Sequence, residues 1–239
     1  MDAFTEYVNR YNMDDINISY KYHHSYRVRD NMVVLAKSMQ LPMCDVKLAE
    51  CIGILHDIGR FEQLKRFNSF SDYNIDHGDL ACEVIKEEAL LPKYGIDKDD
   101  YDVAYKAIRY HNKFKIPDDL NKREKLFAKM IRDADKLDII YAFGSGRLKE
   151  IVKQNDSAIS KRISDAFFEE RDIERTKNDT DNDNLVVIFA LAYDINFGLT
   201  LQIIKENDYY NKIYDQIKNK EMFKPYIEKI NSYINERTD

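Results

Sequence analysis

The chain has 239 residues, of which 44% are hydrophobic and 33% are charged, and its formal net charge is -6. This composition is typical of a globular protein and excludes a disordered chain, and the length is sufficient to bury a substantial core. The negative charge argues against a membrane surface or a stable nucleic-acid complex as the main partner, because both are bound by clustered Lys and Arg.

The predicted elements are helices, because apolar residues recur at helical spacing almost throughout the chain. Only seven Gly and four Pro are present, which favours long helices over strands and tight turns. In chain order, the predicted helices span residues 3–11, 22–40, 45–58, 76–90, 100–112, 122–141, 157–170, 184–206, 208–218 and 222–236. The predicted fold class is therefore all-α.

Several residues at the expected helix ends have capping chemistry. Asp45, Asp76 and Asp100 can accept hydrogen bonds from the free N–H groups that open a helix. Gly59 and residues 144–146, which read GSG, are predicted to end helices.

The C-terminal part combines a polar segment with the most apolar stretch of the chain. Residues 177–184, KNDTDNDN, are predicted to form a flexible surface loop. The following stretch, Leu185 to Ile204, is interrupted by Asp194 and Asn196, which favours a buried helix or a pair of helices over a membrane span.

Cysteine usage and the N-terminal residues indicate a cytoplasmic location. The three cysteines, Cys44, Cys51 and Cys82, are an odd number without ligand-like spacing, which favours free thiols in a reducing compartment. The opening residues, MDAFTEY, carry early acids and no apolar segment, so we expect no secretion signal.

Polar side chains fall on the apolar faces of five predicted helices. In each case the spacing aligns a metal-binding side chain with residues expected in the core. These side chains are His24, His56, His77, His111 and Asp135. Asp57 is a sixth candidate, which lies beside His56 and about 100° around the helix axis from it. A single inward histidine is more often a hydrogen-bonded core residue than a ligand, so the recurrence on five helices is what favours a metal site.

The mixture of imidazoles and carboxylates limits the ion. A buried Asp is costly unless it is paired, hydrogen-bonded or bound to a metal. Several imidazoles with two carboxylates suit Mn, Fe, Co, Ni or Zn, with Mg also considered, whereas Ca favours oxygen ligands. We expect one or two divalent ions.

Three segments resemble the HD-domain superfamily of metal-dependent phosphohydrolases. ILHDIGRFEQ at 54–63 resembles the defining His-Asp doublet, HSYRV at 24–28 the motif of the first histidine, and DADKLD at 133–138 the segment of the distal aspartate. The similarity covers about residues 20–141. It implies an HD-domain-like helical bundle with additional C-terminal helices at about 151–239, and we expect residues 1–239 to form a single domain.

The resemblance also implies roles for the candidate ligands. His24, His56, Asp57 and Asp135 match the residues that bind one metal in the family, and His77 and His111 lie where binuclear members add histidines. Asp57 would then bridge two ions. Because Tyr110 stands where some binuclear members have a second histidine, a vacant or labile second site is the alternative.

The expected catalytic residues are Asp57, Arg60 and Lys136. Asp57 would orient a nucleophilic water as well as bind metal, while Arg60 and Lys136 would contact phosphate. Some nucleotidase-like members carry an acidic residue at the position of Arg60, so their acid-base assignment does not transfer. A surface Arg at a helix end is the alternative interpretation. Further basic residues after the proposed ligands are Lys65, Arg66, Lys113 and Lys115.

The predicted function is hydrolysis of a phosphate ester, of a nucleotide or similar small phosphorylated substrate, by a metal-activated water. Two alternatives stay open: an HD-type di-iron oxygenase and a non-catalytic nucleotide-binding module. A homodimer formed through the C-terminal helices is also compatible with the sequence.

Overall fold

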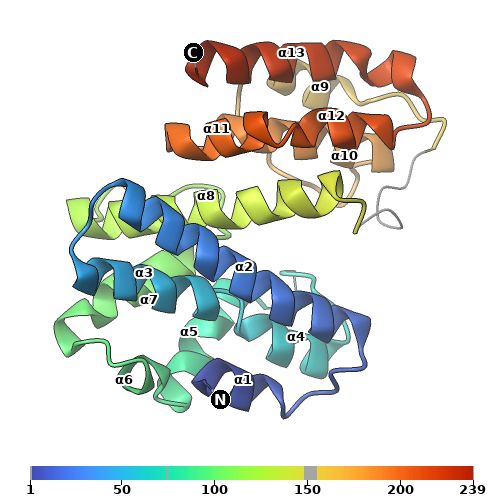
Figure 1. The fold of residues 1–239 in the computed structure, drawn as a ribbon. Helices are drawn as coiled ribbons and strands as arrows, with labels where there is room; N and C mark the ends of the chain where they lie inside the picture. Colours follow the sequence, from blue (N-terminus) through green and yellow to red (C-terminus); the bar gives the residue numbers. More distant parts are fainter. Residues whose placement is uncertain (1, 74, 148–154, 239) are drawn as a thin grey trace. The chain divides into compact units, whose positions relative to one another are not determined.

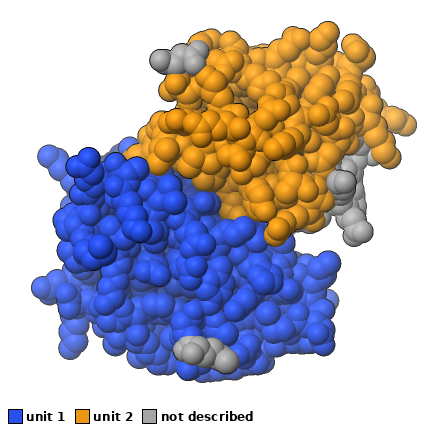
Figure 2. All heavy atoms as spheres, viewed as in Figure 1, with its two compact units in different colours: residues 1–135 blue, residues 136–239 orange. Residues whose placement is uncertain are grey.

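The computed structural model describes residues 2–73, 75–147 and 155–238, and these residues contain helices and no strand. The all-α prediction is confirmed. The chain divides into two compact units, residues 1–135 (unit 1) and residues 136–239 (unit 2), shown in two colours in Figure 2. That the whole chain forms one domain stays a prediction, and the start expected for the C-terminal extension, near residue 151, lies outside the described residues.

The N-terminal helices follow one another through short connections (Figure 1). They are α1 (Ala3–Val8), α2 (Ile16–Ser38), α3 (Met43–Leu55), α4 (Gly59–Phe67), α5 (His77–Glu87), α6 (Leu90–Lys93), the 3-10 helix η1 (Lys98–Asp100), α7 (Tyr101–Tyr110) and α8 (Lys122–Gly144). The boundary between the two units falls within α8, between Asp135 and Lys136.

Two glycines allow the helices of unit 1 to approach closely. Helices α2 and α3 pack along each other, and a Cβ at Gly53 would lie only 2.7 Å from the Cα of Arg29. Helices α4 and α5 meet at Gly59, where a Cβ would lie 2.6 Å from the backbone nitrogen of Ala81. These close approaches leave no room for larger residues, and they bring α2 close to α3 and α4 close to α5, the helices next to which or on which His24, His56, Asp57 and His77 lie.

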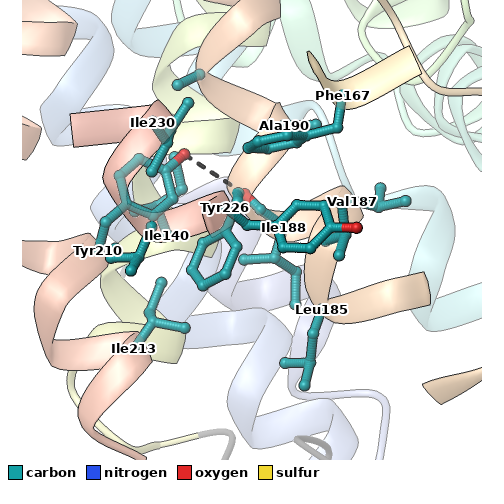
Figure 3. Packing of buried hydrophobic residues seen from close by; sticks show 14 of the residues in the cluster. Ile140, Phe167, Leu185, Val187, Ile188, Ala190, Tyr210, Ile213, Tyr226 and Ile230 are labelled. Atoms are coloured by element: carbon teal, nitrogen blue, oxygen red, sulfur yellow. Dashed lines mark hydrogen bonds between the residues drawn. The ribbon is translucent and has the colours of Figure 1, made fainter. Parts of the chain in front are cut away.

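Unit 2 has its own apolar core. Its helices are α9 (Lys161–Phe168), α10 (Asp181–Ala190), the 3-10 helix η2 (Leu191–Asp194), α11 (Gly198–Glu206), α12 (Tyr209–Asp215) and α13 (Lys220–Thr238). In Figure 3, Phe167, Ile188, Tyr210 and Ile230 pack in this core. The hydroxyl of Tyr210 donates a hydrogen bond to the carbonyl of Ile188 (3.4 Å), so this buried polar group is satisfied.

The predicted helix at 184–206 is a pair of α-helices separated by η2. Helix α10 begins earlier than predicted, at Asp181, because Thr180 and Asp183 form a capping box. The surface loop predicted at 177–184 is therefore too long by four residues.

Other predicted helix ends are partly wrong. Asp76 caps α5 as predicted, but Pro42 stands at the cap position of α3, so Asp45 lies in its first turn. Asp100 makes no capping bond and instead accepts a hydrogen bond from Arg123. Gly59 begins α4 rather than ending a helix, and α4 and α6 are absent from the predicted elements. Helix α8 ends at Gly144, as the GSG segment indicates.

Candidate metal centre

All six candidate ligands lie in unit 1, and the structure brings their side chains together. They come from α2, the turn after α3, the start of α5, the end of α7, and α8. In that order they are His24, His56 with Asp57, His77, His111 and Asp135. The four histidines and Asp57 are buried, and the Asp135 side chain is 20% exposed.

The local backbone explains why adjacent His56 and Asp57 both reach the site. Helix α3 ends at Leu55 and α4 begins at Gly59, so the doublet occupies a tight turn between them. The N–H of Ile58 donates to the carbonyl of Leu55 (3.1 Å), and that of Arg60 donates to the carbonyl of Asp57 (2.9 Å). The turn thus projects an imidazole and a carboxylate into the same space.

The two carboxylate oxygens of Asp57 face two different pairs of histidines. Its Oδ2 lies 3.4 Å from His24 Nε2 and 3.6 Å from His56 Nε2. Its Oδ1 lies 3.3 Å from His77 Nε2 and 3.6 Å from His111 Nε2. Asp57 therefore stands between two groups of nitrogen donors.

Asp135 completes the first of these groups. Its Oδ1 lies 3.2 Å from His24 Nε2 and 3.8 Å from His56 Nε2. Donor atoms about 2.1 Å from one shared ion lie roughly 3.0 to 3.5 Å from each other, so these separations fit a common ion after small adjustments. The sets His24, His56, Asp135 and His56, Asp57, His111 each have ligand atoms within 4.8 Å of one another and could hold a metal ion.

Hydrogen bonds to the outer ring nitrogens orient three of the imidazoles. The Nδ1–H of His56 donates to the carbonyl of Gly53 (2.8 Å), and that of His111 donates to the carbonyl of Ile108 (2.6 Å). The Nδ1–H of His77 donates to the Asp72 carboxylate (2.7 Å). Because carbonyl and carboxylate oxygens can only accept a hydrogen bond, the proton of each neutral imidazole is assigned to Nδ1. Each Nε2 then directs a lone pair toward the site.

Two observations at these inward nitrogens indicate that the site suits a cation. His77 Nε2 and His111 Nε2 lie 3.0 Å apart, and two lone pairs at that distance repel unless a positive charge lies between or beside them. The buried Nε2 of His56 has no hydrogen-bond partner among the described residues. A divalent ion bound by these nitrogens would resolve both costs, so the residues present fit a metal.

The protonation states also suit metal binding. Burial lowers the pKa of His56 to about 3 and that of His77 to about 4. Burial by itself raises the pKa of Asp57, but Lys21 and His56 outweigh it and hold that pKa well below its ordinary value. Burial also raises the pKa of Asp135, but its interactions with His24 and His56 together outweigh that effect, so this pKa too lies below its ordinary value. At neutral pH the site thus holds neutral His56 and His77 beside ionised carboxylates, which are the forms that bind metal.

The two predicted phosphate contacts are both engaged within the protein. Arg60 Nη1 donates to the carbonyl of Phe70 (2.6 Å) and to the side chains of Gln63 (2.8 Å) and Asp72 (3.1 Å), while its Nε lies 3.7 Å from Asp57 Oδ1. The Lys136 ammonium forms an ion pair with Asp194 (2.7 Å) within unit 2. Phosphate binding by either residue stays a prediction.

Two charged residues that contact the candidate ligands were not among the residues predicted from the sequence. Lys21 donates to Asp57 Oδ2 (2.6 Å), and Asp72 orients His77. Lys21 lies three residues before His24, on a neighbouring position of the same helix face, which is a usable signal. Asp72 lies in the segment between α4 and α5, where no periodicity indicates which way a side chain points.

The family model of the HD domain matches residues 22–140 of the chain. The chain belongs to the HD-domain superfamily. The matched range agrees with the resemblance expected over residues 20–141, and it contains all six candidate ligands of the HD domain. The HD domain indicates a superfamily of metal-dependent phosphohydrolases. No curated protein and no solved structure matches the chain significantly.

The structure also bears on membrane association of this HD-domain protein. Across residues 2–73, 75–147 and 155–238, none of the helices combines the length and the apolar character that crossing a bilayer requires.

Proposed function

We propose that the protein is a metal-dependent phosphohydrolase that cleaves a phosphate ester of a nucleotide or a similar small phosphorylated substrate. The observation that carries the proposal is the position of Asp57, whose two oxygens face His24 with His56 on one side and His77 with His111 on the other. A carboxylate between two imidazole groups is suited to bridging two ions.

Each residue has a proposed task. His24, His56 and Asp135 would hold one ion, His77 and His111 the other, and Asp57 would bind both. Bound divalent metal supplies an acidic water and neutralises developing negative charge on a phosphoryl group. Asp57 would orient that water, and the burial of the four histidines and Asp57 would limit the access of bulk solvent to it.

Arg60 is the better supported of the two proposed phosphate contacts. Its Nε lies 3.7 Å from Asp57 Oδ1, and its Nη1 donates to the carbonyl of Phe70 and to Asp72, so the guanidinium is held beside the proposed metal ligands. A guanidinium held in this way matches phosphate oxygens with little loss of side-chain entropy. Lys136 stays a proposed contact, which would require it to leave its ion pair with Asp194.

The test combines metal analysis with phosphate release. The purified protein is loaded with Mn, Co or Ni, its metal content is measured, and hydrolysis is followed on p-nitrophenyl phosphate and a panel of nucleotides. Asp57→Ala should lose bound metal and activity together, whereas Asp30→Ala, an exposed aspartate of the same unit, should keep both. Full metal content and rate in Asp57→Ala would refute the assignment.

One alternative keeps the ions and changes the reaction. Four histidines and two carboxylates in two groups also suit a di-iron site that activates oxygen, as in HD-type oxygenases. Oxygen consumption by the iron-loaded protein without phosphate release would favour the oxygenase. Nucleotide binding without turnover of either kind would favour a non-catalytic binding module.

A further inference from the structure

Several basic residues expected around the substrate instead form ion pairs with acids outside the proposed ligand set. Lys65 and Arg66 pair with Glu62, Lys113 pairs with Asp76 and Asp79, and Lys136 pairs with Asp194. Lys21 differs from them because its partner is Asp57, the carboxylate between the two histidine groups.

The contact of Lys21 is made at a specific oxygen. Lys21 Nζ lies 2.6 Å from Asp57 Oδ2, which is the oxygen that faces His24 and His56. The Asp57 side chain is 3% exposed, whereas that of Lys21 is 17% exposed. A partly exposed side chain thus places its ammonium on a buried carboxylate oxygen.

An ammonium and a divalent ion at the same oxygen repel each other strongly, since both are poorly screened in a buried site. The lysine stem is flexible, and its ammonium can rotate away while its methylene groups stay in contact with the protein. Phosphate oxygens of a substrate bound at the site would offer the displaced ammonium a new anionic partner on the exposed side.

We propose that Lys21 is a metal-responsive phosphate contact. In the metal-free protein its ammonium compensates the buried charge of Asp57. When the first ion binds, the Lys21 ammonium leaves Asp57 Oδ2 and contacts a phosphate oxygen of the substrate. This inference rests on the proposed function, and it adds a residue that competes with metal before loading and binds substrate after it.

The first experiment measures Mn²⁺ affinity by calorimetry for the full-length protein, Lys21→Met and Lys21→Gln. Lys106→Met is the matched control, because Lys106 pairs with the buried carboxylate of Glu124 (2.7 Å), which belongs to no proposed ligand group. Both Lys21 variants should bind Mn²⁺ about tenfold more tightly than the unmodified chain, since no ammonium opposes the ion. The control should bind as the unmodified chain does.

Thermal unfolding and kinetics provide independent readouts. Lys21→Met should lower the melting temperature of the metal-free protein, because Asp57 loses its compensating charge, but not that of the Mn²⁺-loaded protein. Lys21→Gln retains a donor for Asp57 and covers the case in which Lys21→Met does not fold. For the loaded enzyme, both variants should raise the KM for p-nitrophenyl phosphate severalfold, and Lys21→Arg should restore it in part.

The outcomes separate this inference from the proposed function. If the unmodified protein binds no Mn²⁺, the proposed function fails and the inference fails with it. If the unmodified protein binds Mn²⁺ but both Lys21 variants bind it equally or more weakly, the competition is refuted while the metal site stands. An unchanged KM would refute the substrate contact.

Discussion

Asp72 holds His77 by a hydrogen bond from the ring Nδ1–H to its Oδ1 (2.7 Å). Burial raises the pKa of Asp72, but His77 and Arg60 outweigh it, so the carboxylate is ionised. Asp72 also accepts from Gln63 Nε2 (3.1 Å), which fixes the segment between α4 and α5. The carboxylate therefore sets both the tautomer and the orientation of the imidazole.

Replacing Asp72 by Ala should weaken binding at the ion site that includes His77. Loss of such an outer hydrogen bond typically lowers metal affinity by about 10- to 100-fold. Metal content after dialysis against a weak chelator measures the effect. Asp79→Ala is the control, since Asp79 lies in α5, the helix that His77 begins, and pairs with Lys113 and Arg109 instead of His77. Equal retention by the two variants would contradict this role.

His77→Ala and His111→Ala should each reduce the metal content from two ions to one. The double variant should resemble either single variant, because both residues are assigned to the same ion and their effects are then not additive. Elemental analysis of the Mn²⁺-loaded proteins measures the stoichiometry. His23→Ala removes an exposed histidine and should keep two ions. Two ions in His111→Ala would show that the second site is assembled differently.

Gly59→Ala should destabilise unit 1 by about 1 to 3 kcal/mol or more, because overpacking forces backbone to move. The new Cβ would lie 2.6 Å from the backbone nitrogen of Ala81 and still closer to the carbonyl oxygen of His77. Denaturant unfolding measures the loss. Gly198→Ala, at the start of α11, meets nothing within 4 Å and should be neutral or slightly stabilising. Similar stabilities of the two variants would argue against a tight approach of α4 and α5.

The stability of unit 2 should depend on the ionisation of Asp183. Burial raises the pKa of this carboxyl group, but hydrogen bonds from Thr180 and Ser160 outweigh it and lower the pKa below its ordinary value. The unfolded state therefore takes up a proton first on acidification, so the stabilisation is present above about pH 4 and is lost as the pH falls through the folded-state pKa.

Unfolding free energies measured between pH 7 and pH 2.5 test this dependence. Asp183→Asn should lower stability at pH 7 by about 1 to 2 kcal/mol and flatten the acid limb of the profile. Asp181→Asn removes a carboxylate from the same first turn without touching these bonds and should retain the profile. If the unfolding free energy of Asp183→Asn fell as steeply with decreasing pH as that of the unmodified protein, the loss of stability in acid would be due to other groups.

Periodicity was sufficient to predict the fold class and the approach of the ligand helices. His24, His56 and Asp135 each align with core residues at helical spacing, so their direction could be read from the sequence. Gly59 was misassigned because the turn between α3 and α4 is so short that a glycine beside it resembles a helix end. The physical role of Gly59 is to make room for α5. This contact joins residues far apart in the sequence, so a local sequence pattern does not encode it.

The surroundings of the candidate ligands were less predictable. Lys21 carries a charge in a chain where a third of the residues do, so its type alone gives no reason to single it out, and only its position three residues before His24 on the same helix face is a signal. Asp72 lies outside any helix, and its contact with His77 depends on how the segment between α4 and α5 folds back. The charge and position of Arg60 and Lys136 indicate phosphate contacts, but their partners in the structure, Asp72 and Asp194, depend on tertiary contacts that the sequence pattern does not encode.

The candidate ligands are spread over more than a hundred residues of unit 1, from His24 to Asp135. A nascent chain therefore cannot present the complete set until α8 has left the ribosome, and a chelator that removes the ions would withdraw support from the whole of unit 1 rather than from one loop. If the candidate ligands bind metal as proposed, its acquisition would be a late event in the maturation of the protein, and bound metal would report that the N-terminal half has reached the native state.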